Sequence, residues 1–214
     1  NAVLCNYAKV LGLLKKDAEV VGAKVQDALS NDVFEVRATV IINCTGVFAD
    51  DVLKMDNPEA KATIRLSQGV HIVLDKSFLP GDEAIMVPQT TDGRVLFAVP
   101  WHDVVIVGTT DTPLEQRDLD PVAQEDEIKF ILDNAGMYMS KKPTKADILS
   151  VFAGLRPLAA GENGSESSKE VSRHHKVLVS PSGLISVLGG KWTTYRKMGE
   201  DAIDNALVVG ALPP

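Results

Sequence analysis

Cysteine is scarce in this sequence: Cys5 and Cys44 are the two among 214 residues. Two cysteines cannot build a disulfide framework, and neither has a cysteine or histidine partner at metal-ligand spacing. The four histidines also lack the spacing with carboxylates that a metal centre requires. We therefore expect no metal site, and a protein from a reducing compartment.

A surplus of positive charge and long apolar runs are also missing. The formal net charge is −7 and no basic cluster offsets it, which argues against binding nucleic acid through its phosphates. No apolar run approaches the ~18 residues of a membrane-spanning helix. A hydrophobic share of 45% still supplies a proper core, so we expect a globular chain of one large or two small domains.

The most informative stretch is an apolar run, residues 185–188, that stops at Gly189-Gly190 and restarts as a helix opened by Thr193-Thr194. This pattern predicts a strand, a tight turn and a helix N-terminus. Glycines let a ligand approach the backbone, and helix N–H groups favour an electron-rich or anionic one, with Lys191 adding positive charge. Alternatively, the glycines only make the turn, a threonine caps the helix and Lys191 is solvated.

Two other stretches carry a similar signal. Arg156 stands between apolar residues at a predicted strand end, where Pro157 stops the ladder, and an arginine in such surroundings usually meets an anion. Residues 40–44 form an apolar run that precedes Thr45-Gly46 and an amphipathic segment, residues 47–55. They predict a second strand, turn and helix, with a plain structural turn as the alternative.

Apolar alternation predicts three successive antiparallel strands near the N-terminus, the last running on to Cys44, and then a mainly antiparallel sheet. Extended segments are expected at residues 2–5, 8–14, 20–29, 33–42, 65–74, 84–87, 95–99, 104–109, 147–155 and 176–180. Helices are expected at residues 47–55, from 124 or 125 to 137, and 195–209. The first helix breaks at Asn57-Pro58, and composition changes there, so a domain boundary is expected near residue 60.

Five motifs in order resemble the FAD-dependent glycerol-3-phosphate dehydrogenases. They are Asn43-Cys44-Thr45-Gly46, Asp92-Gly93-Arg94-Val95-Leu96-Phe97, Val107-Gly108-Thr109-Thr110-Asp111-Thr112, Gly154-Leu155-Arg156-Pro157-Leu158 and Gly189-Gly190-Lys191-Trp192-Thr193-Thr194-Tyr195-Arg196-Lys197. The resemblance runs from near residue 1 to about residue 207. The family opens with a Gly-x-Gly-x-x-Gly fingerprint and closes with a helical domain, and this sequence has neither. We therefore expect an internal piece of a longer enzyme, which by itself binds FAD poorly or not at all and is inactive.

The resemblance implies an α/β (α+β) fold of the kind found in glycine oxidase and D-amino-acid oxidase-like flavoproteins. Residues 1–59 are expected to form part of an FAD-binding, Rossmann-like domain. Residues 60–183 are expected to form a substrate-binding domain built on a mixed, mainly antiparallel β-sheet. Residues 184–214 are expected to return to the FAD-binding domain with a strand and a helix.

The expected chemistry is oxidation of a secondary alcohol, which needs a base for the hydroxyl proton and groups that orient the substrate. The resemblance places Arg156, Arg173, Lys191 and Thr193 around the substrate, with a catalytic role for Arg156. Guanidinium groups grip a phosphate dianion through bidentate hydrogen bonds. Without the resemblance, the sequence around Arg173 indicates a strand residue whose side chain is solvated.

His71 is the candidate general base, because imidazole titrates near neutral pH and this one interrupts an apolar strand. The alternative is a core histidine whose hydrogen bonds are satisfied. The resemblance aligns His71 with a histidine near the flavin. His102 is expected to be structural, and neighbouring His174 and His175 point to opposite faces of a strand, so that one of them approaches a site only by chance.

The implied cofactor is FAD, which accepts the hydride while the protein orients and tunes it. A helix N-terminus at the flavin would stabilise negative charge on the reduced ring. The residues that the resemblance places near FAD are Thr45, Gly46, Gly189, Gly190, Lys191, Trp192, Thr193 and, through a backbone contact to the adenine half, Val10.

The implied function is oxidation of sn-glycerol 3-phosphate to dihydroxyacetone phosphate, with electrons passed from FAD to quinone or, in an oxidase, to oxygen. One alternative is a flavin-dependent amine oxidase in which Arg156 holds a carboxylate, although Arg173 and Lys191 favour a dianion. Another is a non-catalytic phosphoester-binding module. A cytoplasmic location is expected, and the resemblance allows peripheral attachment of the parent to the cytoplasmic membrane and a homodimer.

Overall fold

The computed structural model describes residues 2–160 and 174–213. Their contacts divide the chain into two compact units. Unit 1 comprises Asn1–Arg65 and Pro157–Pro214, and unit 2 comprises Leu66–Arg156. Two segments that are distant in sequence therefore build unit 1, and the segment between them builds unit 2.

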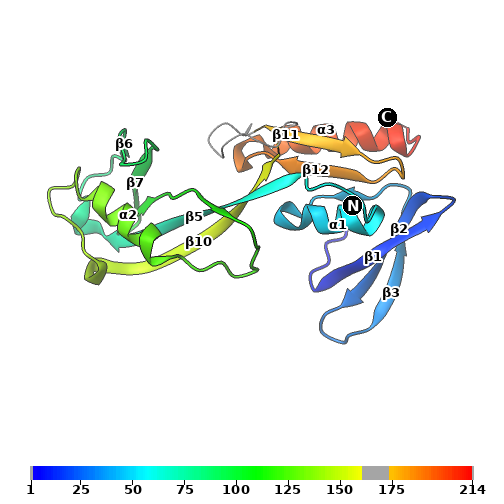
Figure 1. Ribbon diagram of the computed structural model, residues 1–214, viewed down its shortest axis with the longest axis horizontal. Coiled ribbons are helices and arrows are strands. Elements are labelled where there is room, and N and C mark those ends of the chain that lie inside the picture. Colours follow the sequence, from blue (N-terminus) through cyan, green and yellow to red (C-terminus); the bar gives the residue numbers. More distant parts are fainter. Residues whose placement is uncertain (1, 161–173, 214) are drawn as a thin grey trace. The chain divides into compact units, whose positions relative to one another are not determined.

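The division falls within two long strands, β5 (Ile64–Asp75) and β10 (Ile148–Ala159) (Figure 1). Its second boundary differs from the one expected at residue 183, because β11 (His175–Val179) pairs with β12 (Ile185–Gly189) and so belongs to unit 1. Which unit serves the cofactor and which the substrate stays a prediction.

Unit 1 begins with a three-stranded antiparallel sheet of β1 (Ala8–Lys16), β2 (Glu19–Asp27) and β3 (Val33–Arg37). Asp17 and Ala18 turn the chain between the first two strands, with φ angles of 52° and 71°. This confirms the expected meander. Residues 2–5 form no strand, contrary to prediction.

The expected continuation of the third strand to Cys44 is wrong, because β3 ends at Arg37 and the next apolar residues enter another sheet. There, β4 (Ile42–Asn43) pairs in parallel with β12, which pairs antiparallel with β11. The Asn43 amide donates to Ser186 Oγ (3.2 Å) and to Ala49 O (3.0 Å). This buried side chain thus ties β4 to β12 and to the following helix.

Two α-helices complete the described part of unit 1, α1 (Ala49–Asp56) and α3 (Tyr195–Val209). α3 runs along β11 and β12 (Figure 1), and its small residues Ala202 and Ala206 are the buried ones. Leu184, just before β12, is fully buried in a cluster with Val52 and Leu53 of α1. None of the helices in the described part of the chain is long and apolar enough to cross a membrane.

Unit 2 is built on one sheet with the strand order β10-β5-β8-β7-β6 and with β9 beside β5. The remaining strands are β6 (Ile85–Val87), β7 (Leu96–Trp101), β8 (Val104–Gly108) and β9 (Thr112–Leu114). β5, β6, β7, β8 and β9 pair antiparallel, as expected. Short 3-10 helices in the described residues of both units span Gly46–Phe48, Lys76–Phe78, Lys145–Asp147 and Trp192–Thr194.

α2 (Glu125–Ala135) covers one face of this sheet. Its Ile131 and Ala135 pack against alternate residues of the strands, including Ile72 of β5 and Val107 of β8. Each large apolar side chain buried here contributes ~1.5–3 kcal/mol. Since side chains alternate along a strand, the neighbours of Ile72 lie on the opposite face of the sheet.

The prediction that Pro157 stops its strand is wrong, because β10 continues through it to Ala159. β10 lies at the end of the strand order. A proline is tolerated on an edge strand where its missing N–H would face away from the ladder. Arg156 therefore lies inside an edge strand and not at a strand end.

Candidate active site

The Gly189-Gly190 turn joins β12 to the segment before α3, as predicted. Both residues have left-handed backbone angles, with φ of 68° and 83°. A Cβ on Gly190 would lie 2.5 Å from Met198 Sδ, and one on Gly189 would lie 3.1 Å from Ala159 Cβ. Conformation and space therefore both require glycine here.

A 3-10 turn, and not the α-helix itself, follows the two glycines. The hydroxyl of Thr194 donates to Lys191 O (3.0 Å) and accepts from Lys191 N (3.3 Å), so it closes this turn. Thr194 makes no side-chain capping bond to α3. Lys191, Trp192 and Thr193 are exposed, Trp192 to 87%.

The second turn, Thr45-Gly46, also takes the predicted place between a strand and a helix. Asn43 Oδ1 accepts from Thr45 Oγ1 (2.7 Å) and Thr45 N (3.3 Å), and Gly46 has a φ of 58°. Asn43 is only 2% exposed. This role of Asn43 was not predicted from the sequence, although an amide at the end of an apolar run was the available signal.

A cavity of about 300 Å³ opens beside both turns within unit 1. It is lined by Cys44, Gly46, Pro157, Val187, Gly189, Tyr195, Met198, Gly199 and Ala202. The lining is largely apolar, and burial raises the pKa of the Cys44 thiol, which therefore stays uncharged at neutral pH. A Cβ on Gly46 would meet no atom within 4 Å, so the space in front of that turn is open.

Of the predicted cofactor residues, Gly46 and Gly189 line this cavity. The predicted residues in the two turns that do not line it are Thr45, Gly190, Lys191, Trp192 and Thr193. Val10 lies on β1 and pairs with Val25 of the meander, and it does not line the cavity. Arg173 lies outside the described residues. Their predicted contacts with cofactor and substrate stay predictions.

Arg156 lies over Gly69 in unit 2, and a Cβ on that glycine would collide with the guanidinium group. Arg156 Nη1 donates to Thr110 O (3.1 Å) and Nη2 donates to Thr109 Oγ1 (2.9 Å). Asp111 Oδ1 is 3.9 Å from Nη1. Although these contacts hold the side chain, it is 36% exposed, so an anion from solvent can reach its positive charge.

His71 is two residues from Gly69 on β5, so both face the same side of the sheet, opposite Ile72 and the core. Its ring lies over Gly108, where a Cβ would collide with it. Burial, and then the positive charge of Arg156, lower the pKa of His71 below 6.5. The imidazole is thus neutral at pH 7 and able to accept a proton.

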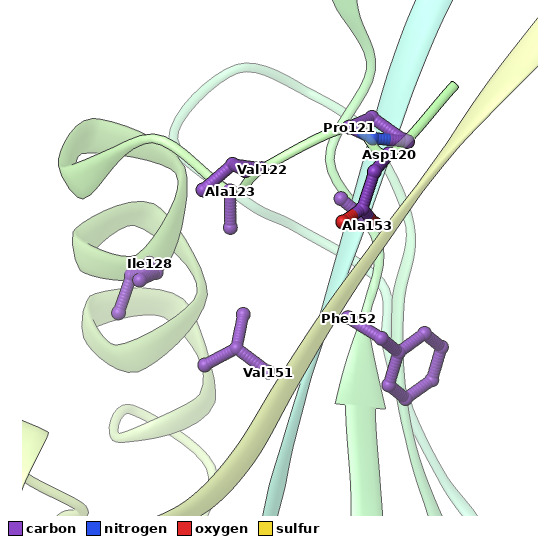
Figure 2. Close-up of a pocket in the computed structure, with 8 residues that line it drawn as sticks. All are labelled: Asp120, Pro121, Val122, Ala123, Ile128, Val151, Phe152 and Ala153. Carbon is purple, nitrogen blue, oxygen red and sulfur yellow. The ribbon is translucent and has the colours of Figure 1, made fainter. Parts of the chain in front are cut away.

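Unit 2 has a further cavity of about 460 Å³ between α2, residues 120–123 and β10 (Figure 2). In Figure 2, Val151 points toward Ile128, whereas the Phe152 ring points away from it. None of the predicted site residues lines this cavity. Among the described residues, no cluster of histidine, cysteine or acidic side chains could hold a metal ion.

Comparison with known proteins shows the family. Residues 1–196 match the family model described as FAD dependent oxidoreductase. The chain belongs to this family. The residues around the unit 1 cavity fit a flavin, because the glycine turns leave space beside the backbone and an uncharged, mostly apolar lining suits a flat ring.

The sequence is similar to glycerol-3-phosphate dehydrogenases, which confirms the resemblance. A mitochondrial glycerol-3-phosphate dehydrogenase of Arabidopsis thaliana is 40% identical, with 100% of this chain and 34% of that protein covered. The mitochondrial enzyme of Homo sapiens is 41% identical, with 96% of this chain and 29% of that protein covered. The chain thus spans about a third of the length of these relatives.

Solved structures confirm the expected fold class. A glycerol-3-phosphate dehydrogenase from Bacillus halodurans, complexed with FAD, matches with a TM-score of 0.81 and 33% identity, covering 95% of this chain and 38% of that one. Glycine oxidase from Bacillus cereus matches with a TM-score of 0.60, covering 97% and 50%. At 13% identity the second likeness concerns the fold alone.

Proposed function

We propose that the polypeptide containing this chain oxidises sn-glycerol 3-phosphate to dihydroxyacetone phosphate with FAD as cofactor. The observation that carries this proposal is that Arg156 of β10 and His71 of β5 lie on the same face of the unit 2 sheet, each above a glycine. An anion-binding group and a neutral base are what a phosphorylated alcohol requires. Relatives named glycerol-3-phosphate dehydrogenase, about 40% identical, support the same substrate.

Arg156 would bind the phosphate group. Its guanidinium plane is fixed by Thr109 and Thr110 before any substrate arrives, so little side-chain entropy remains to be lost on binding. The fixed charge also selects an anionic substrate. Arg173, Lys191 and Thr193 are proposed as further substrate contacts on the strength of the family resemblance.

His71 would accept the proton of the substrate hydroxyl. Arg156 disfavours a positive charge on the imidazole, which keeps it in its basic form. Gly46, Gly189 and Gly190, together with Thr45, Lys191, Trp192 and Thr193, are proposed to hold FAD, and Val10 its adenine half. Bound FAD would supply the acceptor for the hydride.

Dye reduction by the intact flavoprotein tests this function. The protein is offered glycerol 3-phosphate in one assay and sarcosine or glycine in another, with an artificial electron acceptor. Reduction by the phosphoester alone, lost in Arg156→Ala, supports the proposal. Reduction by the amines would instead make the protein an amine oxidase, and a flavin-loaded protein inert to both would have another substrate.

The electron acceptor and location are further parts of this proposal. Quinone as acceptor, peripheral association of the parent with a membrane and a homodimer rest on the family resemblance. A cytoplasmic location rests on the scarcity of cysteine, whereas the names of the two relatives contain the word mitochondrial. Quinone reduction in vesicles, cell fractionation and sedimentation of the purified protein test these points separately.

A further inference from the structure

Glu127 is a buried carboxylate that the proposed reaction does not use. It lies in the first turn of α2 and is 5% exposed. Oε1 accepts from Thr112 Oγ1 (2.6 Å) and Thr110 Oγ1 (3.0 Å), and Oε2 accepts from Gln68 Nε2 (2.7 Å) and Gln124 N (2.9 Å). Burial tends to raise the pKa of Glu127, but these donors outweigh it and hold the pKa below its usual value.

One of these four bonds belongs to the helix. The bond from Gln124 N completes the capping box of α2, which stabilises a helix start by itself. The bonds from Gln68, Thr110 and Thr112 have no part in capping. They connect α2 to β5 through Gln68, to the loop between β8 and β9 through Thr110, and to the start of β9 through Thr112.

That loop holds Arg156. Thr110 donates its hydroxyl to Glu127, accepts from Val70 N (3.0 Å) through the same oxygen, and accepts from Arg156 through its carbonyl. Because its hydroxyl makes two hydrogen bonds, the Thr110 side chain is held in one orientation. Its carbonyl oxygen therefore stays where Arg156 Nη1 can reach it.

Thr112 and Asp111 complete the arrangement. Glu127 binds Thr110 and Thr112, the residues on either side of Asp111. Asp111 accepts from Ser67 Oγ, and its carboxylate lies 3.9 Å from Arg156 Nη1. Glu127 thus holds both neighbours of the carboxylate that faces the guanidinium group.

We propose that Glu127 is a positioning residue, which fixes the Thr110 carbonyl and Asp111 so that the Arg156 guanidinium is aimed at the anionic group of the substrate. Glu127 itself does not contact the substrate. This inference rests on the proposed role of Arg156 in binding the phosphate. It makes α2, on the core side of the sheet, part of the apparatus for anion affinity.

Substitution of Glu127 by glutamine tests the proposal in the intact flavoprotein. Glutamine keeps the volume but removes the negative charge. With its Nε2 toward Gln68 and Gln124 it would oppose their donors, and with its Nε2 toward the hydroxyls of Thr110 and Thr112 it would replace charge-assisted hydrogen bonds by weaker neutral ones. We expect the KM for glycerol 3-phosphate in Glu127→Gln to rise about tenfold, as for loss of a hydrogen bond to a charged group, with kcat changed far less. The matched control is Glu125→Gln, an exposed acid in the same helical turn.

A double-mutant cycle separates positioning from general loss of structure. If Glu127 acts through Arg156, Glu127→Gln has no further effect on substrate affinity in an Arg156→Ala background. The dissociation constant of inorganic phosphate, measured by calorimetry, should follow the same pattern without turnover. Equal, additive effects in both backgrounds would overturn the proposal.

Two further outcomes are distinguishable. If Arg156→Ala leaves the KM and the phosphate affinity unchanged, the proposed function of Arg156 fails. If Arg156→Ala weakens both while Glu127→Gln behaves like Glu125→Gln, the inference alone fails. Should Glu127→Gln not fold, Thr112→Val removes one donor at constant shape, and a KM rise of about threefold that vanishes in the Arg156→Ala background is then the deciding result.

Discussion

The rings of His71 and Phe152 stack almost in parallel, with centroids 5.0 Å apart and 7° between their planes. Phe152 lies on β10, four residues before Arg156, and His71 lies on β5. One strand therefore supplies both the ring that covers the imidazole and the charge that disfavours its protonation. Base strength and anion binding are coupled through β10.

Replacement of His71 by asparagine tests its role as the base. We expect His71→Asn to lower kcat on glycerol 3-phosphate by ~10²–10⁴-fold, the usual contribution of general-base catalysis. Affinity for inorganic phosphate should be kept, because Arg156 is untouched. The pH dependence of kcat/KM should also lose its acid limb, which in the unaltered enzyme lies at a lower pH than an ordinary histidine would give, because the pKa of His71 is lowered. His102→Asn, in an exposed turn, is the control, and an unchanged profile in His71→Asn would exclude this base.

Phe152→Leu should move the acid limb of the same profile to higher pH. Burial is the larger cause of the lowered pKa of His71, and removal of the stacked ring admits water to the imidazole. The protonated form becomes easier to make, so the pKa rises toward its ordinary value and activity is lost at a higher pH. Trp101→Leu, which removes an exposed ring from the end of β7, should leave the limb in place. A shift to lower pH in Phe152→Leu would contradict this account.

Local patterns predicted most of the elements. Alternating apolar residues marked the meander and the sheet of unit 2, and helical spacing marked α1, α2 and α3. The prediction failed where pairing partners decide the outcome. Residues 42–43 were predicted to be the end of the third strand. In the structure they belong to another sheet, because they pair in parallel with β12 and Asn43 donates a hydrogen bond to Ser186. The local sequence does not distinguish between these two strand pairings.

The candidate site could be predicted only residue by residue. Arg156 and His71 stood out as polar residues in apolar strands, whereas Gly69 and Gly108, which make room for them, looked like ordinary strand glycines. Glu127 was visible as the third residue of a helix, and its capping box with Gln124 was the available signal. Its bonds to Thr110 and Thr112 depend on tertiary packing.

Gly69→Ala should weaken substrate binding, because its Cβ would occupy the place of the Arg156 guanidinium. We expect a KM for glycerol 3-phosphate about tenfold higher, which corresponds to ~1.4 kcal/mol, with a smaller change in kcat. Gly154→Ala is a matched control on β10, since a Cβ there meets no atom within 4 Å. Equal KM values in the two variants would show that the position of Arg156 above Gly69 has no part in binding.

Gly190→Ala should reduce flavin retention. The residue has a φ of 83°, where alanine is strained by ~1–3 kcal/mol, and its new Cβ would press on Met198 Sδ at 2.5 Å. Met198 lines the unit 1 cavity, so relief of the clash deforms the proposed FAD site. We expect a lower ratio of flavin absorbance to protein after purification and a lower midpoint for heat-induced flavin release. Gly12→Ala, in β1 with open space around its Cβ, should match the unaltered protein in both measurements. If Gly190→Ala lowers the unfolding temperature but keeps full flavin content, the turn serves the fold and does not shape the cofactor site.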